Sequence, residues 1–331
     1  MIAGASAAAT SAVSGRPDAH HHRPTRLVYI GGVGRSGSTL LNDLLGQHRD
    51  VVAVGELVHL FQRGLVENNL CGCGARFADC PFWTRVGGQL DGGWDVEDGH
   101  RYLALKQRVD RNRHSLSLIA PLNLPRFRNA LSDYGDRYRR LIEAVRSQSG
   151  AAVVVDSTKQ ISTALLMRRL PLDLRIVHLV RDSRGVAYSW TKEKRKVEVI
   201  DDDAMMNRYP PALMAWRWLS WNIVFASFRL LGVPVVTVRY EDLIAHPDQT
   251  LRRVLRFADL DAGALDFIER DTIDLQPVHS VAGNPSRFQK GKVALRLDEA
   301  WRDQMPAGAR RWVTVLTAPL LGRYGYLRGG R

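Results

Sequence analysis

Long apolar runs are missing from this 331-residue chain, and so are the marks of a secreted or repetitive protein. No stretch approaches the roughly 20 apolar residues of a membrane-spanning helix, which predicts a soluble, cytoplasmic protein without a transmembrane segment. Residues 1–24 hold no apolar core flanked by basic residues, so a secretory signal is not indicated, and their Ala, Ser, Gly and His content predicts a disordered tail. No internal repeat or long linker divides residues 25–325, which predicts one domain.

Acidic residues are outnumbered, since 47 lysines and arginines face 34 aspartates and glutamates, a formal net charge of +13. Such a balance is typical of nucleic-acid-binding proteins, but the sequence has no recognition-helix, zinc-finger or RNA-binding signature, and its arginines are dispersed. We therefore expect no nucleic-acid partner. The charge instead favours substrates with several negative charges, which it attracts from a distance. Nothing in the composition indicates an oligomeric state.

Cysteine is also scarce, and all three cysteines lie in one segment, CGCGARFADCPFW, at Cys71, Cys73 and Cys80. Three thiols at short spacing are compatible with zinc, with His59 or His100 as a possible fourth ligand. However, the spacing is not one of the standard two-pair zinc patterns. We interpret the segment as a structural loop with at most one disulfide, and expect no bound metal.

Five short, β-rich apolar runs alternate with segments of helical spacing. The runs cover residues 27–30, 51–54, 152–155, 176–180 and 233–238. This alternation predicts an α/β fold with a central parallel sheet that binds its ligands at the carboxyl ends of the strands. Residues 57–148 lack strand signals and carry long helical patterns, which predicts a helical insertion.

A glycine-rich segment, GGVGRSGSTLL at residues 31–41, directly follows the first apolar run. A turn of this kind between a strand and a helix presents backbone N–H groups and a helix dipole to an anion. The segment has the glycine spacing of a Walker A loop, but Ser38 occupies the position of the Walker lysine. The cation of this segment is Arg35. We interpret the loop as a phosphate cradle that does not suit an ordinary nucleoside triphosphate with Mg²⁺.

A second motif, RIVHLVRDSRGVAYSW, occupies residues 175–190. Its apolar strand is expected to end at Arg181, and Ser189 lies eight residues later in the helix that follows. An arginine at the end of a strand and a hydroxyl two turns into the next helix can hold one phosphate from two sides.

The two motifs, in this order and each at a strand-to-helix junction, resemble those of the sulfotransferase family. The cysteine segment is similar to one found in a bacterial branch of that family. The resemblance extends from Arg26 to about Met305 and implies a P-loop-like three-layer fold. It also implies that residues 25–325 transfer a sulfuryl group from 3′-phosphoadenosine 5′-phosphosulfate (PAPS) to an acceptor hydroxyl, without a metal. The class of acceptor stays open.

The resemblance assigns roles to single residues. Glu56, in VGELVH, is similar to the catalytic glutamate of tyrosylprotein sulfotransferases and is our expected base, with His59 as its rival and a helix-end carboxylate as the alternative interpretation. Lys159 is expected to act with Arg35 as a cation beside the leaving phosphate. The expected donor-binding residues are Arg35, Ser36, Gly37, Ser38, Thr39, Arg181, Ser189, Tyr240, Arg287 and Lys290.

Three of these assignments depend on looser similarity. Tyr240 resembles tyrosines that touch the donor nucleotide, and Arg287 and Lys290 belong to a segment, GNPSRFQKG, that resembles the family's basic loop over the 3′-phosphate. The alternatives to a sulfotransferase are a P-loop nucleotide kinase or NTPase, for which Asp156 would be the Mg²⁺-holding acid, and a non-catalytic PAPS- or polyanion-binding module.

Overall fold

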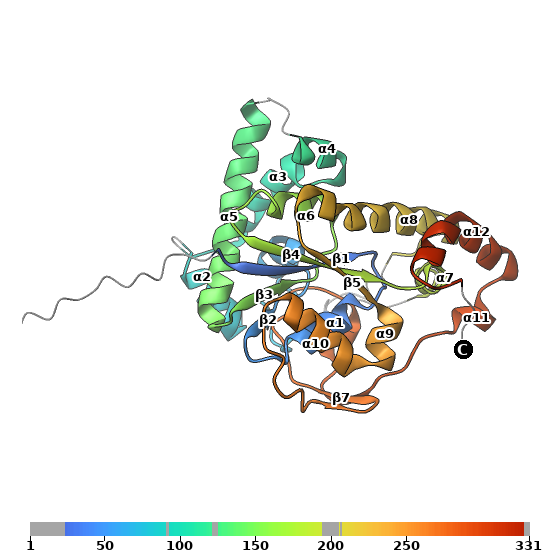
Figure 1. Ribbon diagram of the computed structural model, residues 1–331. Coiled ribbons are helices and arrows are strands. Elements are labelled where there is room, and N and C mark those ends of the chain that lie inside the picture. Colours follow the sequence, from blue (N-terminus) through green and yellow to red (C-terminus); the bar gives the residue numbers. More distant parts are fainter. Residues whose placement is uncertain (1–23, 91–92, 121–124, 194–204, 206, 328–331) are drawn as a thin grey trace, which may run out of the picture.

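The structure is a computed structural model, which describes residues 24–90, 93–120, 125–193, 205 and 207–327 (Figure 1). The expected disordered tail, residues 1–24, lies outside the described residues except for Pro24. Among the described helices, none is both long enough and apolar enough to cross a membrane.

A parallel sheet of five strands forms the centre of the molecule, in the order β2-β3-β1-β4-β5. The strands are β1 (Arg26–Gly32), β2 (Val51–Ala53), β3 (Val153–Asp156), β4 (Asp173–Val180) and β5 (Val235–Arg239). All five predicted runs are therefore strands. Their β-branched residues favour the extended backbone. Burial on both faces explains why the runs of β1 to β4 are continuously apolar, whereas the edge strand β5 is mostly half-buried.

Helices cover both faces of the sheet, because alternate side chains of each strand point to opposite sides. Leu27 and Tyr29 of β1 enter one core, whereas Val28 and Ile30 enter the other. The first core is covered by α2 (Pro81–Gly88), α3 (Val96–Val109), α4 (Ser115–Ile119), α5 (Pro125–Ser149), α6 (Ile161–Met167) and α8 (Pro211–Ser227). The second is covered by α1 (Ser38–Leu45), α9 (Tyr240–Ala245) and α10 (Pro247–Phe257). Figure 1 shows these two helical layers above and below the sheet, which confirms the predicted three-layer α/β fold.

The predicted helical insertion is confirmed, since the chain between β2 and β3 forms η1 (Leu57–His59), η2 (Leu60–Val66) and α2–α5. Asp110, fully buried at the end of α3, ties this insertion to α6. Its carboxylate accepts hydrogen bonds from Tyr134 Oη at 2.8 Å, from Ser162 Oγ at 2.7 Å and from Thr163 Oγ1 at 2.9 Å. A buried carboxylate with this many donors fixes the insertion to the sheet domain rather than destabilising it.

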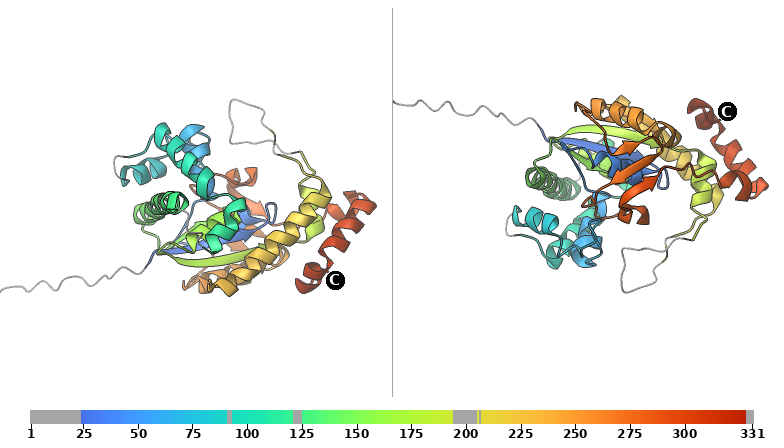
Figure 2. Two further views of the ribbon diagram at one scale, coloured as in Figure 1. Left: turned by 90° about the horizontal axis from the view of Figure 1, so that it is seen from above. Right: turned by 90° about the horizontal axis from the view of Figure 1, so that it is seen from below.

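A second, antiparallel sheet was not predicted. It consists of β6 (Ile268–Glu269), β7 (Thr272–Leu275) and β8 (Gly291–Ala294), which are too short to show a period in the sequence. The sheet lies on the side of α9 and α10, as the view from below in Figure 2 shows. The long connection between β7 and β8, which contains η5 (Pro285–Phe288), returns to the central sheet.

Three further helices pack with α8 rather than in either of the two cores that flank the central sheet. They are α7 (Ser183–Ser189), α11 (Trp301–Gln304) and α12 (Ala307–Arg323), which form a separate apolar cluster with α8. Trp301 is buried in this cluster.

Candidate active site

A cavity of about 490 Å³ opens at the carboxyl edge of the central sheet. Each strand delivers a predicted site residue to its wall: Arg35 follows β1, Glu56 follows β2, Lys159 follows β3, Arg181 ends β4, and Tyr240 follows β5. Parallel strands end at the same edge, so residues far apart in the sequence meet there. The cavity therefore lies where a parallel α/β sheet binds its ligands.

The loop before α1 forms one wall of this cavity through Gly34, Arg35, Gly37, Ser38 and Thr39, whereas Ser36 is buried beneath it. Gly37 is the N-cap of α1, has φ of 90° and offers no side-chain cap. A Cβ atom at Gly37 would lie 2.3 Å from the Tyr240 ring, so only glycine fits. The first N–H groups of α1 thus have no side-chain acceptor from the N-cap and can bind an anion.

Both predicted catalytic cations have an unusual backbone conformation. Arg35 has φ of 73° and Lys159 has φ of 66°, in the left-handed region that non-glycine residues rarely adopt. Each costs on the order of 1 kcal/mol or more, and such residues concentrate at functional sites. The guanidinium of Arg35 lies 5.0 Å from the ring centre of Trp190, whose Nε1 donates to the carbonyl of Gly34 at 3.0 Å. Trp190 thereby orients Arg35, a role that no sequence motif indicated.

Glu56 lies between two basic groups at the cavity wall. Its Oε1 is 2.8 Å from Lys159 Nζ, and its Oε2 is 3.5 Å from His59 Nε2. Burial raises the pKa of the Glu56 carboxyl, but Lys159, followed by His59, outweighs burial and lowers this pKa to about 2. Glu56 is therefore ionised at neutral pH and paired with Lys159.

His59, the rival base, lines the same cavity. Burial lowers its pKa to about 4, although Glu56 acts in the opposite sense, so the imidazole is neutral at pH 7 and can accept a proton. His59 also lines a second cavity, of about 540 Å³, whose wall includes Lys106, Arg111 and Arg113 of the helical insertion. The insertion thus borders a space that adjoins the first cavity at His59.

Arg181 is held in place by three neighbours. Its guanidinium lies 4.6 Å from the ring centre of Tyr240, its Nη1 donates to the carbonyl of Arg35 at 3.1 Å, and its Nη2 is 3.3 Å from an oxygen of the Asp298 carboxylate. Ser189 is buried at the end of α7 and lines the same cavity. The predicted arginine and serine therefore share one cavity, together with the carboxylate of Asp298, which the sequence did not suggest.

Arg287 and Lys290, the two basic residues expected over the 3′-phosphate, do not line this cavity. Arg287 is 2% exposed and donates to the carbonyls of Ser280 at 2.6 Å and Leu70 at 2.8 Å. The turn η5 directs this side chain into the interior, whereas Lys290 Nζ donates to the carbonyl of Cys73 at 3.1 Å. Gly283, Asn284, Ser286 and Gln289 of the same segment line the cavity instead, and so does the basic Arg296, which follows β8.

Asp156, the acid that a kinase or NTPase would require, is fully buried beneath the cavity and does not line it. Its Oδ1 accepts hydrogen bonds from the N–H groups of Thr158 at 2.8 Å and Leu57 at 3.3 Å, and its Oδ2 accepts one from Tyr138 at 3.3 Å. These contacts give Asp156 a structural role at the end of β3.

Asp43 is a further cavity residue that the sequence did not suggest. It lies on the buried side of α1, four residues after Thr39, and accepts a hydrogen bond from Asn42 Nδ2 at 3.1 Å. Burial raises the pKa of the Asp43 carboxyl to about 7, although Asn42 and Arg287 act in the opposite sense. A single acid after an anion-binding loop has no motif, and only its position four residues after the loop could have indicated it.

Asp43→Asn should flatten the pH dependence of stability. Between about pH 4 and 7 the folded protein keeps a proton on Asp43 that the unfolded chain has released, so the free energy of unfolding falls as pH rises and is constant above this window. The contribution lost is at most roughly 4 kcal/mol. Urea unfolding at pH 5 and pH 8 measures it, with the exposed Asp266→Asn as control. Equal pH slopes for Asp43→Asn and the wild type would contradict the assignment.

Comparison with known proteins identifies the family to which the chain belongs. Residues 89–263 match the family model described as "Sulfotransferase family". The chain is 21% identical over 313 residues to protein-tyrosine sulfotransferase 2 of Gallus gallus, covering 91% of this chain and 69% of that protein. It is 23% identical over 312 residues to protein-tyrosine sulfotransferase of Drosophila melanogaster, covering 92% of this chain and 52% of that protein. The chain thus spans about half the length of the fly relative.

Two solved structures share the fold. The sulfotransferase domain from the curacin biosynthetic pathway has a TM-score of 0.52 and 16% identity, over 90% of this chain and 98% of that chain. The sulfotransferase domain from a Synechococcus olefin synthase has a TM-score of 0.50 and 19% identity, over 92% and 96%. At these identities the likeness concerns the fold alone, an α/β architecture with a central five-stranded parallel sheet.

Proposed function

Since this chain belongs to the sulfotransferase family, we propose that it transfers a sulfuryl group from PAPS to an acceptor hydroxyl. One observation carries the proposal: the anion-binding loop, the Glu56–Lys159 pair and Arg181 face a single cavity. Because the residues that line this cavity extend from Gly34, just after the first strand, to Asp298, after β8, we take residues 25–325 as the transferase domain.

Size and charge of the cavity suit the donor. Its volume of about 490 Å³ lies within the usual range for nucleotide-sized ligands. Five basic side chains line it against three acidic ones. The basic ones are Arg35, Arg63, Lys159, Arg181 and Arg296. We assign the phosphosulfate to the loop before α1 and the 3′-phosphate to Arg181 and Ser189, with Tyr240 beside the nucleotide and Arg296 as an additional cation.

The transfer itself needs no redox step and no metal in this proposal. The acceptor oxygen forms a bond to sulfur while the bond from sulfur to the 5′-phosphate oxygen breaks, and the electron pair leaves with the phosphate. Arg35 and Lys159 neutralise the charge that develops on that oxygen, and the loop N–H groups hold the sulfonate oxygens. The acceptor's proton passes to a carboxylate oxygen of Glu56.

The ion pair between Lys159 and Glu56 suggests that the donor activates the base. With a pKa of about 2, Glu56 is a weak base while Lys159 Nζ stays 2.8 Å away. A phosphosulfate in the cavity competes for the same ammonium group. As Lys159 turns to the donor, the pKa of Glu56 rises, and its carboxylate becomes a stronger base only when a donor is present.

The acceptor is proposed to enter through the second cavity, which meets the first at His59. Its wall carries Lys106, Arg111 and Arg113, together with the amides of Gln62, Gln107 and Gln160. Basic and amide groups favour an acceptor whose hydroxyl lies near an anionic group. This narrows the acceptor to polar, negatively charged hydroxyl compounds without distinguishing a peptide from a carbohydrate.

Ligand-induced stabilisation tests the function directly. Adenosine 3′,5′-bisphosphate, added in the presence of EDTA, should raise the melting temperature, and at 100 times its Kd it should stabilise the fold by about 2.7 kcal/mol. ATP with Mg²⁺ should not do so, because Asp156 is buried beneath the cavity. Stabilisation by ATP with Mg²⁺ alone would favour a kinase or NTPase. Binding of the bisphosphate without any transfer from labelled PAPS, across acidic acceptor panels, would favour a non-catalytic module.

A further inference from the structure

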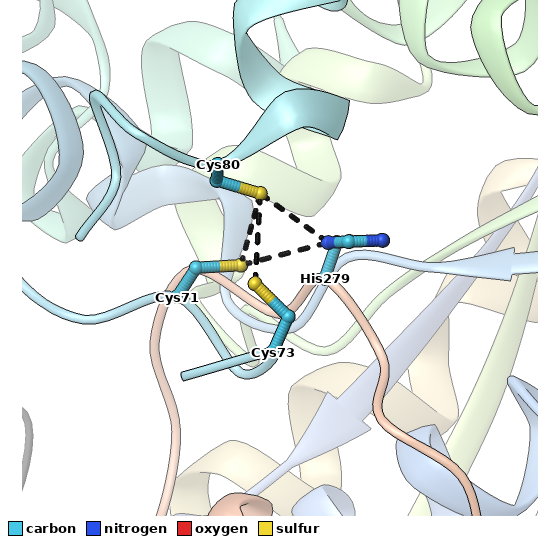
Figure 3. Close-up of side chains that lie close together, drawn as sticks. All are labelled: Cys71, Cys73, Cys80 and His279. Carbon is cyan, nitrogen blue, oxygen red and sulfur yellow. Dashed lines mark hydrogen bonds between the residues drawn. The ribbon is translucent and has the colours of Figure 1, made fainter. Parts of the chain in front are cut away.

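Four metal-ligating side chains converge away from the catalytic cavity (Figure 3). They are Cys71, Cys73, Cys80 and His279, whose ligand atoms all lie within 4.8 Å of one another. The Cys80 sulfur is 3.7 Å from each of the other two sulfurs and 3.3 Å from His279 Nδ1. The Cys71 sulfur is 3.9 Å from the same nitrogen. Figure 3 shows the three sulfurs and this nitrogen pointing toward a common centre.

These separations match a tetrahedral zinc site. Zinc–sulfur bonds of about 2.3 Å and a zinc–nitrogen bond of about 2.0 Å, set at tetrahedral angles, put sulfurs about 3.8 Å apart and sulfur and nitrogen about 3.5 Å apart. A disulfide requires sulfurs at about 2.05 Å. The Cys80 sulfur is equally far from both of its neighbours, and all three cysteines are free, so no pair is preferred for a disulfide.

We propose that these four residues bind one structural Zn²⁺ ion. Three thiolates and one imidazole are the soft and borderline ligands that zinc prefers, and four protein ligands leave no open position for a substrate. None of the four lines the catalytic cavity, so the ion takes no part in the transfer. The fourth ligand is His279 rather than the expected His59 or His100, and it is 199 residues from Cys80 in the sequence.

The two segments that carry the ligands, residues 71–83 and 278–280, pack against each other and hold the four ligands in position. The His279 ring stacks on Phe82 at 4.8 Å between ring centres, and Trp83 Nε1 donates to the His279 carbonyl at 3.1 Å. Gly72, between two of the cysteines, donates its N–H to the Ser280 carbonyl at 2.9 Å. A Cβ atom there would lie 2.4 Å from the Val278 carbonyl oxygen, so glycine is required for this approach.

The zinc ion would join the helical insertion to the segment that supports the catalytic cavity. Directly after His279, the N–H of Val281 donates to the Val54 carbonyl at 3.0 Å, and the Ala282 carbonyl accepts from the N–H of Glu56 at 3.2 Å. The same segment continues to Asn284, which lines the cavity. The ion would therefore fix the backbone that leads into Glu56 without touching the substrate.

Metal analysis and X-ray absorption of the full-length, untagged protein test the proposal. One zinc per chain is expected, with three sulfur neighbours at about 2.3 Å and one nitrogen at about 2.0–2.1 Å. The sequence His20-His21-His22 could also bind metal during purification, so the variant with alanine at all three positions is measured in parallel. It should keep its zinc. Zinc surrounded by nitrogen and oxygen only, or lost with the three histidines, would overturn the proposal.

Thiol labelling gives an independent measurement, because the chain has only three cysteines and all belong to the cluster. All three should resist alkylation in the native protein and react after chelation and unfolding without reductant. A single reactive thiol after unfolding would indicate a disulfide and overturn the proposal, as would three thiols that react fully in the native protein before any chelator is added.

Substitution of the histidine tests its assignment. His279→Ala should lose zinc to a chelator at least 10-fold faster than the wild type, since one of four ligand bonds is gone. His246→Ala, which removes an exposed histidine between α9 and α10, should behave as the wild type. Zinc retention equal to that of the wild type in His279→Ala would exclude His279 as a ligand. If the variant does not fold, absorption and labelling of the wild type still decide, and neither depends on the transferase activity.

Discussion

Glu56→Gln is expected to lower kcat by about 10²–10⁴-fold while donor affinity stays near that of the wild type. The amide keeps the size of the carboxylate and can still accept a hydrogen bond from Lys159 Nζ, 2.8 Å away, but it cannot take the acceptor's proton. Single-turnover transfer from labelled PAPS measures the loss. Calorimetry with adenosine 3′,5′-bisphosphate measures the donor affinity on the same protein.

His59→Ala is the control, because His59 Nε2 lies 3.5 Å from the Glu56 carboxylate and lines both cavities. In the protein without donor, the pKa values of about 2 for Glu56 and about 4 for His59 leave both groups unprotonated at neutral pH, so activity at neutral pH alone does not separate the two candidates. Substitution of each residue does separate them. If His59→Ala abolishes turnover and Glu56→Gln does not, the base is His59, and Glu56 serves only to hold Lys159.

Arg181→Ala should weaken the binding of adenosine 3′,5′-bisphosphate by about 30- to 150-fold, which corresponds to roughly 2–3 kcal/mol for a charge-assisted phosphate contact. The carboxylate of Asp298, 3.3 Å from Arg181, would then face the phosphate without its cation and add repulsion. Calorimetry measures the affinity. The affinity of Arg181→Lys should lie between those of the wild type and Arg181→Ala, because lysine keeps the charge but lacks the planar guanidinium with its several donors.

Arg184→Ala is the matched control for Arg181. It removes the same charge three residues later, from a guanidinium that pairs with Asp182 at 2.6 Å and does not line the cavity. Its effect on affinity should be under threefold if the contact, rather than net charge, binds the phosphate. Equal losses of affinity in Arg181→Ala and Arg184→Ala would mean that Arg181 acts only through the net charge of the protein and does not contact the phosphate.

The sequence alone determined the sheet and most of the proposed active site. Four of the strands were recognisable because short runs buried on both faces are continuously apolar, and the half-buried β5 was recognisable by its β-branched residues. Once the sheet is parallel, its carboxyl edge follows, and residues that come directly after a strand must meet there. This is why Arg35, Glu56, Lys159 and Arg181 could be grouped before any contact between them was known.

Only the tertiary structure decided which side chains point into the cavity and which residues far apart in the sequence contact each other. In the irregular segment after β7 no period sets which side chains point inward, so the turn that buries Arg287 has no local signature, and neither has the position of Arg296, after β8, at the cavity. Asp43 acquires its raised pKa from burial, which a single acid in a helix does not indicate. His279 meets three cysteines about 200 residues away only because the segment after β7 packs against the helical insertion.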